Sequence, residues 1–248
     1  TEYEHAVTLA RSRELRGPYE VHPENPILTS LGNPDLALQK AGHASLVETP
    51  SGEWYMPHLC GRPIPGTRRC NLGRETAIQK VEWREDDWLY LSCGGNEPQA
   101  EVPAPDLEPH SFPELPSRLP FDSPHYATPR GPSSSVVRKP NRLTLEGKES
   151  LESNFEQAML ARRLTSQRST VTTRLSFEPE SFQQMAGLAA YYNTYLFHYL
   201  YLSMDEEKGL CLQIHTCDDG VSSSGLGEEF LRQLAPRSRE VTLLPNGA

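Results

Sequence analysis

Two side chains in the first hundred residues belong to types that can do chemistry: a histidine and an arginine. His43 follows Gly42 in the stretch QKAGHASLVET, and an imidazole can exchange a proton near neutral pH, form hydrogen bonds or bind a metal. Arg74 lies in the motif LGRET, and its guanidinium is an always-charged fork of donors that suits hydroxyls and carboxylates. Taken alone, each also has a plain structural interpretation, as a hydrogen-bonded core histidine and as a surface arginine beside Arg68 and Arg69.

No metal-binding or disulfide pattern surrounds these two residues. His5 and His58 add no spacing typical of a metal site. The five cysteines are an odd number at irregular spacing, which predicts free, partly buried thiols rather than a disulfide framework. A Cys60–Cys70 bridge across the intervening loop is the alternative left open.

Composition limits the class of protein. The 248 residues carry a net charge of −9 and are 36% hydrophobic and 23% charged, as in a globular protein with a real core. The acidic balance argues against a role centred on nucleic acid or on a membrane surface, since both need clustered Lys and Arg. Both chain ends fall inside strand-like runs, so we expect a piece of a longer protein.

The elements that must position the two side chains are short strands. AGHASLVET, EWYMPHL, AIQKVEW and WLYLSCG are separated by turn signals, which is typical of a β-sandwich, β-barrel or β-propeller. The stretch 182–204 is uncharged and long enough to cross a bilayer. Its polar residues and five tyrosines favour instead an aromatic β-hairpin that turns at Asn193-Thr194. Residues 205–209 predict a second hairpin turn, and FEQAMLARRL is helical by propensity.

A change in composition divides the chain. Eleven of the 22 prolines lie between Asn96 and Pro140, and a proline-rich segment donates few ladder hydrogen bonds and stays extended. We therefore predict a first domain over 1–96, a proline-rich linker or draped connection over 97–140, and a second β domain over 141–248.

Several longer motifs resemble a known enzyme family. YEHAVTLARS, GPYEVHPENPILTS, QKAGHASLVET, GEWYMPHLCGRP and LGRETAIQKVEW resemble the second half of the catalytic domain of glycoside hydrolase family 43, as found in its two-domain β-xylosidases and α-L-arabinofuranosidases. ESLESNFEQAMLARR and FEPESFQQMAGLAAYYNT resemble the concanavalin A-like sandwich that follows that domain. The resemblance covers most of the chain apart from the proline-rich segment and the C-terminal stretch.

The resemblance implies an all-β fold, in which part of a five-bladed β-propeller is followed by an incomplete jelly-roll β-sandwich. It implies exo-acting hydrolysis of xylose or arabinose units from xylan-derived oligosaccharides, with inversion, by two carboxyl groups far enough apart to admit a water. The family's catalytic glutamate and two aspartates precede the part that this chain resembles. We therefore predict that no catalytic residue is present, that the chain alone is inactive, and that Glu2, Glu4, Glu48 and Glu75 are solvated or structural.

The resemblance also assigns roles to the two side chains. Arg74 matches the family's active-site arginine, which reaches the bound sugar near the general acid. His43 matches the histidine on the floor of the active site, where some members hold a calcium ion or an ordered water. We therefore expect both residues to bind substrate and His43 to be the candidate ligand of a structural calcium. The loop before LGRET is shorter than is usual in the family, which leaves substrate selectivity open.

Two alternatives remain on the sequence alone. One is a non-catalytic carbohydrate-binding protein that uses the tyrosines of the second domain, although these alternate as core residues do. The other is an interaction protein whose segment PSRLPFDSP is bound by a domain that recognises extended proline-rich peptides. The expected partner is a xylan-derived oligosaccharide, and both the preference for xylose or arabinose and the formation of a homo-oligomer are left open.

Overall fold

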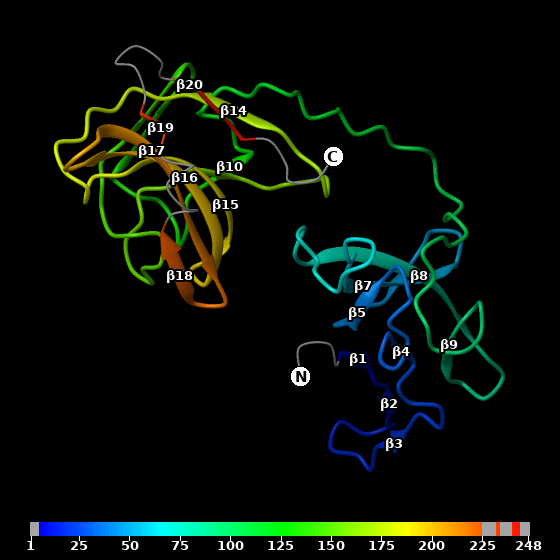
Figure 1. Ribbon diagram of the computed structural model, residues 1–248. Coiled ribbons are helices and arrows are strands. Elements are labelled where there is room, and N and C mark those ends of the chain that lie inside the picture. The colour runs from blue at the N-terminus through cyan, green and yellow to red at the C-terminus, as the bar shows by residue number, and fades with distance from the viewer. Residues whose placement is uncertain (1–4, 225–231, 234–239, 244–248) are drawn as a thin grey trace. The chain divides into compact units, whose positions relative to one another are not determined.

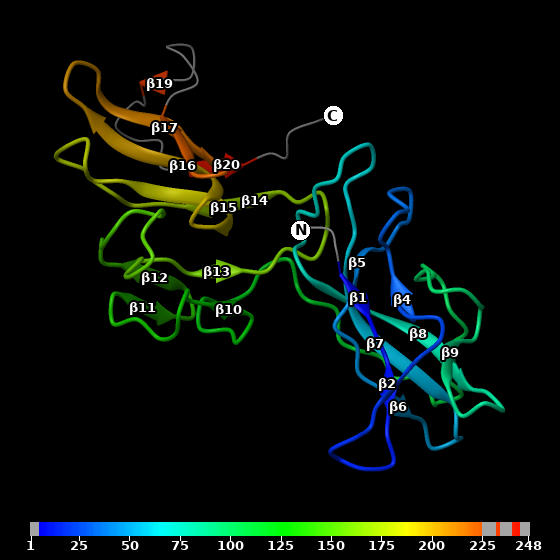
Figure 2. The same ribbon diagram turned by 90° about the horizontal axis from the view of Figure 1, so that it is seen from below.

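The computed structural model describes residues 5–224, 232–233 and 240–243, and every regular element in this part is a strand (Figures 1 and 2). The predicted all-β class is thereby confirmed. The described part contains no helix that is long and apolar enough to cross a membrane. The chain divides into two compact units, Thr1–Glu114 and Leu115–Ala248. This division falls inside the segment predicted as a linker, and the predicted domain boundaries themselves stay a prediction.

The first unit is organised around one antiparallel sheet. Its strand order is β5-β7-β8-β9, and β6 continues the edge beside β7. Two short ladders, β1-β4 and β2-β3, complete the unit. The strands are β1 (Ala6–Val7), β2 (Ala10–Arg11), β3 (Glu20–Val21), β4 (Leu28–Thr29), β5 (Gln39–Gly42), β6 (Val47–Glu48), β7 (Trp54–Gly61), β8 (Glu75–Trp83) and β9 (Leu89–Leu91).

The core of the first unit lies on one face of this sheet. Met56 on β7 and Val81 on β8 alternate with residues of the opposite face, as the period of two requires. They pack with Leu28 of β4 and Leu91 of β9 in a cluster of buried apolar side chains. The turn between β6 and β7 is closed at Gly52, whose φ of +83° suits a residue without a side chain.

The second unit has longer strands and a more regular sheet, of order β15-β16-β17-β18, with β19 also paired to β17. Three two-stranded ladders, β10-β13, β11-β12 and β14-β20, accompany it. The strands are β10 (Tyr126–Ala127), β11 (Val136–Lys139), β12 (Arg142–Leu145), β13 (Ala161–Arg162), β14 (Val171–Arg174), β15 (Ala186–Asn193), β16 (Leu196–Asp205), β17 (Gly209–Asp218), β18 (Val221–Ser224), β19 (Arg232–Gln233) and β20 (Glu240–Leu243).

The predicted hairpins of the second unit are confirmed, and the predicted helix is wrong. β15 and β16 turn at Thr194-Tyr195, one residue later than predicted, and β16 and β17 turn over 205–209. FEQAMLARRL instead runs irregularly into the short strand β13. Within this stretch Gln157 is 6% exposed and donates hydrogen bonds to the carbonyls of Leu151 and Ser153. Side-chain contacts of this kind override a weak local propensity.

Aromatic side chains pack on one face of the second sheet. Phe197 of β16 is 2% exposed, stacks on Tyr191 of β15 and meets the edge of His215 of β17. Tyr199 and Tyr201 stack next to it with ring centroids 5.1 Å apart. Burial raises the pKa of both tyrosine hydroxyls. These tyrosines therefore behave as core residues rather than as an exposed platform for a sugar.

Candidate functional site

The edge strand that carries His43 is interrupted by two β-bulges. Gln39 pairs with Gly61, and Gly42 pairs with Leu59, so two residues of β5 lie opposite Cys60 alone. The edge resumes where Val47 pairs with Tyr55, and the amide of Ser45 donates to the carbonyl of Pro57. His43 and Ala44 therefore lie opposite His58 alone. Two-against-one pairing defines a β-bulge, and bulges re-aim side chains next to functional sites.

Both bulges contain a left-handed residue that is not glycine. The φ angles are +58° at Lys40 and +51° at His43, a region that costs an ordinary L-residue about 1–2 kcal/mol. A single local strain of this kind supports a hypothesis of function. The prediction that His43 lies within the strand AGHASLVET is wrong, because β5 ends at Gly42 and His43 turns out of the ladder as an exposed residue.

Pro57 explains why the ladder breaks at this point. In an antiparallel pair the two residues of a hydrogen-bonded position exchange both N–H···O bonds. Ser45 donates its half, with an N···O distance of 3.0 Å, but proline has no N–H with which to return it. The edge strand therefore loses one hydrogen bond beside the bulge at His43.

Gly42 permits a close approach, and the group that approaches is the ring of His5. A Cβ added to Gly42 would lie 2.3 Å from Cδ2 of His5, closer than any real contact. The carbonyl of His5 accepts a hydrogen bond of 2.8 Å from the hydroxyl of Thr29. The segment before β1 is thus held against the end of β5, immediately before His43.

Arg74 lies at the other end of the same sheet region, exposed, directly before β8. Its neighbour Glu75 pairs in register with Cys60 and forms a two-pronged ion pair with Arg62. This hydrogen-bonded carboxylate raises the pKa of the Arg62 guanidinium. Glu75 is therefore engaged as a structural carboxylate, as predicted.

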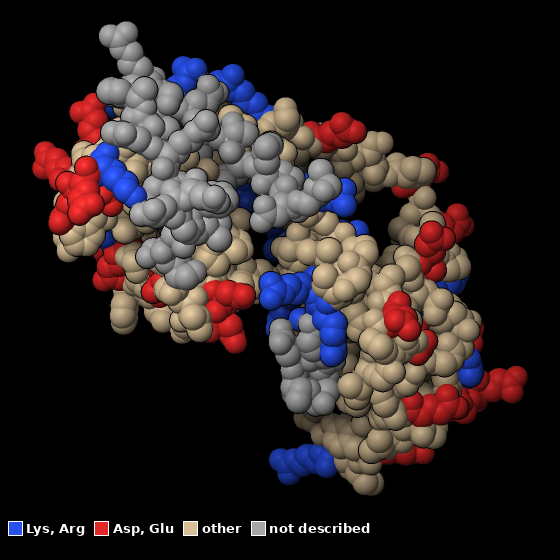
Figure 3. Space-filling model, viewed as in Figure 1, with Lys and Arg blue, Asp and Glu red and all other residues tan. Residues whose placement is uncertain are grey.

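The register places His43 and Arg74 on strands separated by one other strand, β7. Across the sheet, the two residues are separated by two strand spacings of about 4.8 Å each. Along β7, the positions opposite them differ by about three residues, at about 3.3 Å per residue. That His43 and Arg74 bind one sugar stays a prediction. Figure 3 shows both basic and acidic side chains on the visible surface of the described residues.

The carboxyl group of Glu53 does not have the properties of a general acid. Glu53 bonds to the amide of Asp106 and to Lys80, and these contacts lower the pKa of its carboxyl, whereas a general acid needs a raised one. Glu48 is exposed on β6. Glu2 and Glu4 lie outside the described residues. The expectation that the catalytic carboxyls are absent stays a prediction.

No group of three or more His, Cys, Asp or Glu side chains that could hold a metal occurs among the described residues. The residues around His43 therefore do not fit a calcium ion by themselves, and such a site stays a prediction that needs further ligands. The five cysteines, all in the described part of the chain, form no disulfide, as predicted. Burial, with the nearby charge of Glu75 as a smaller cause, raises the pKa of the Cys60 thiol to about 11.

The sequence alone did not reveal the bulges. Two features of the sequence indicate bulges once the pairing is known. One is Pro57 in the middle of a strand that pairs on both sides, and the other is that the edge strand has more residues than the facing part of β7. The pairing partner of a strand is not visible in its own periodicity, so neither feature is decisive without the register.

Two family models match the chain, one in each unit. The model described as "Glycosyl hydrolases family 43" matches residues 1–89. The model described as "Beta xylosidase C-terminal Concanavalin A-like domain" matches residues 118–243, which is just over half of the chain. The first match includes His43 and Arg74, and the second includes the regular sheet of the second unit.

Curated relatives and solved structures agree with these matches. The chain is 44% identical over 256 residues to a β-xylosidase of Bacillus subtilis and covers 46% of it. It is 47% identical over 210 residues to a xylan 1,3-β-xylosidase of a Vibrio species. The crystal structure of a xylan β-1,4-xylosidase from Bacillus halodurans superposes with a TM-score of 0.86 at 50% identity, over 95% of this chain and 46% of that one. The chain therefore spans less than half the length of these relatives.

Proposed function

Because this chain belongs to glycosyl hydrolases family 43, we propose that it supplies the sugar-binding part of an exo-acting, inverting glycosidase that removes xylose or arabinose units from xylan-derived oligosaccharides. Its fold is part of a β-propeller followed by a concanavalin A-like sandwich. The observation that carries the proposal is the match of both units, in order, to a xylosidase structure at 50% identity. Other relatives include an arabinofuranosidase of Bacteroides ovatus at 32% identity, so both pentoses are candidate substrates.

In this proposal His43 and Arg74 bind the sugar and neither transfers a proton. Arg74 offers a permanently charged donor fork to sugar hydroxyls or to a carboxylate supplied by the remainder of the fold. His43 is set out of the sheet by its bulge and offers imidazole nitrogens. The two carboxyl groups needed for inversion come from outside this chain, so the chain alone is expected to be inactive.

The test is a hybrid protein. The segment of the Bacillus subtilis relative that precedes its match to this chain is joined to residue 1, and the hybrid and the chain alone are assayed on nitrophenyl xyloside and nitrophenyl arabinofuranoside. We expect turnover only by the hybrid. Arg74→Ala in the hybrid should lower kcat/KM by about 10- to 100-fold, since hydrogen bonds from charged groups contribute about 1.5–3 kcal/mol. Arg68→Ala in the same loop is the matched control.

Circular dichroism and calorimetry establish whether the hybrid is folded. A folded hybrid that is inactive on both substrates would contradict the proposal, as would robust turnover by the chain alone. Binding of xylo-oligosaccharides to the chain, combined with an inactive folded hybrid, would favour the alternative of a non-catalytic carbohydrate-binding protein.

A further inference from the structure

The first part of the proline-rich segment is held to the first unit by hydrogen bonds at Asn96, Gln99, Pro103 and Asp106. We call residues 96–106 the strap. At its start, the carbonyl of Asn96 accepts from the amide of Thr29, and the side chain of Asn96 donates to the carbonyl of Pro26. At its end, the amide of Asp106 donates to Glu53, whose second carboxylate oxygen accepts from Lys80 at 2.6 Å.

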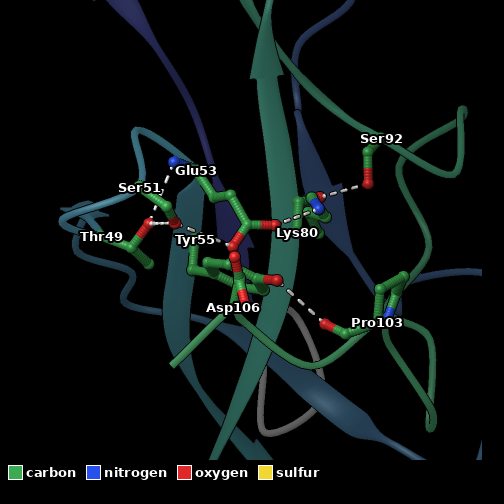
Figure 4. Close-up of polar contacts among 8 residues, drawn as sticks. All are labelled: Thr49, Ser51, Glu53, Tyr55, Lys80, Ser92, Pro103 and Asp106. Atoms are coloured by element: carbon green, nitrogen blue, oxygen red, sulfur yellow. Dashed lines mark hydrogen bonds and ion pairs between the residues drawn. The ribbon is translucent and has the colours of Figure 1, made fainter. Parts of the chain in front are cut away.

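Figure 4 shows the later anchors of the strap together. The hydroxyl of Tyr55 donates to the carbonyl of Pro103 at 3.0 Å, and Tyr55 itself is 2% exposed. Glu53 lies beside it between Lys80 and Asp106. Residues 107–118, in contrast, are all exposed. The anchored strap therefore ends at Asp106, and the open connection starts after it.

The central anchor of the strap is a side-chain clamp. Gln79 of β8 is 1% exposed and holds both backbone groups of Gln99: its Oε1 accepts from the amide at 3.0 Å, and its Nε2 donates to the carbonyl at 3.0 Å. The same Nε2 lies 3.3 Å from Nε2 of His58. This two-sided bond to Gln99 determines which way the Gln79 amide points.

The orientation of Gln79 in turn determines the proton on His58. Nδ1 of His58 lies 2.9 Å from the carbonyl of Leu59, and a carbonyl can only accept, so Nδ1 carries the hydrogen. Nε2 must then accept from the Gln79 amide. His58 is 2% exposed, and its burial lowers the pKa of the imidazole. The closed clamp therefore requires a neutral His58.

A proton on Nε2 of His58 would face the NH₂ group of Gln79, donor against donor. If the side-chain amide of Gln79 were turned over, its oxygen could accept the proton of His58 Nε2. The Gln79 oxygen would then face the carbonyl oxygen of Gln99, and the Gln79 NH₂ group would face the backbone N–H of Gln99. Both hydrogen bonds between the Gln79 side chain and the backbone of Gln99 would then be lost. Protonated His58 and a clamped Gln99 exclude each other.

We propose that His58 and Gln79 form a proton-sensitive clamp that fixes the middle of the strap above about pH 6.5 and releases it at lower pH. His58 binds its proton more weakly in the clamped state than in the open one. The clamp is therefore fully stable above about pH 6.5 and weakens as the pH falls below that value, by up to tenfold in population per pH unit for one proton taken up. Opening of the clamp frees the middle of the strap, residues 97–102, which lies between the remaining anchors at Asn96 and Pro103.

No described carboxylate forms an ion pair with His58, so burial and the clamp dominate its titration. The titratable groups nearest to it in register come from each neighbouring element. They are Cys60 on β7, Glu75 with its partner Arg62 at the facing ends of β7 and β8, His43 in the edge bulge, His5 against Gly42, and Glu97 and Glu101 on the strap.

A protease that cleaves after glutamate can test this inference on the full chain. The Glu101–Val102 bond lies inside the strap, and the Glu114–Leu115 bond lies in the open connection. The bonds after Glu97 and Glu108 precede proline and resist cleavage. New N-termini at Val102 and Leu115 are counted by mass spectrometry between pH 7.5 and 5.0. Their ratio cancels the pH dependence of the protease, and an uncut Glu82–Trp83 bond within β8 shows that the sheet stays folded.

We expect the ratio of strap to connection cleavage to rise at least tenfold from pH 7.5 to 5.0. Gln79→Met should give a high ratio at both pH values, and His58→Leu should give a ratio that does not change with pH. Gln99→Ala, which leaves the clamped backbone groups in place, is the matched control and should behave like the unaltered chain. A pH-independent ratio in the unaltered chain, a protected strap in Gln79→Met, or a persisting pH response in His58→Leu would each overturn the proposal. None of these outcomes depends on the proposed glycosidase activity.

Discussion

The main sheets of the two units differ in how strictly their strands pair. In the second unit, β16 and β17 match residue for residue from Leu196↔Asp218 to Asp205↔Gly209. In the first unit, the edge strand beside β7 needs two bulges and two left-handed residues to stay in register. The regular sheet carries aromatic core packing, and the irregular edge carries the histidine that the family resemblance assigns to the sugar site. Regular pairing here accompanies buried aromatic packing, and irregular pairing accompanies the exposure of His43.

The largest effect is expected from a single methyl group in the regular sheet. A Cβ at Gly187 of β15 would lie 1.9 Å from the backbone oxygen of Leu200, and a backbone atom cannot move aside without breaking the ladder. Gly187→Ala should destabilise the second unit by about 3 kcal/mol or more, measured by calorimetry. Gly147→Ala, where nothing lies within 4 Å, should have little effect. Equal melting temperatures for the two variants would refute the close packing assigned to β15 and β16.

A smaller loss is expected at the irregular edge. Gly42→Ala directs a methyl group at the His5 ring, which is a side chain and can partly yield, so the first unit should lose about 1–3 kcal/mol. The double variant His5→Ala, Gly42→Ala should recover most of this loss, since the two residues are in contact and their effects should not add. Strict additivity in this cycle would show that the ring does not cause the strain.

The next two substitutions test whether the backbone at His43 is strained, because glycine should raise the free energy of unfolding at one site and lower it at the other. His43→Gly should stabilise the first unit by about 0.5–1 kcal/mol, because glycine adopts a positive φ freely while its added freedom in the unfolded chain offsets part of the gain. Ala189→Gly, at a position of β15 that pairs in register with Tyr199, should destabilise the second unit by about 0.5–1 kcal/mol. Chemical denaturation followed separately for each unit gives both values. Destabilisation by both glycines would remove the argument for strain at His43.

The smallest expected effect concerns the rate at which a thiol is labelled rather than the free energy of unfolding. Cys60 has a thiol pKa of about 11, so at pH 8 its thiolate fraction is about a hundredfold below that of a thiol at its ordinary pKa of 9. An exposed thiol such as Cys93 should react with iodoacetamide first, and labelling of Cys60 should rise about tenfold per pH unit up to pH 11. Fast labelling of Cys60 at pH 8 in the folded chain would contradict its burial.

The sequence predicted those features that depend on neighbours along the chain. Alternation and turn residues gave both hairpins of the second unit, the first with its turn one residue early, and the family resemblance gave the partial propeller and the sandwich. Features that depend on partners distant in sequence were missed. The bulge at His43 results from Pro57 on the next strand, and the non-helical course of FEQAMLARRL accompanies the buried contacts of Gln157. The hydrophobic pattern of a segment does not show its contacts with residues distant in sequence.

The absence of a backbone N–H group at Pro57 also affects how readily strands of other chains can pair with the edge of this sheet. An exposed edge strand with a continuous row of N–H and C=O groups is a template for strand addition and aggregation. The edge formed by β5 and β6 is short, is broken at His43–Leu46, and is bent by two bulges. Any strand from a second molecule would meet it in register for only a few residues at a time. The distortion that turns His43 out of the ladder thus also protects this edge of the sheet against unwanted assembly.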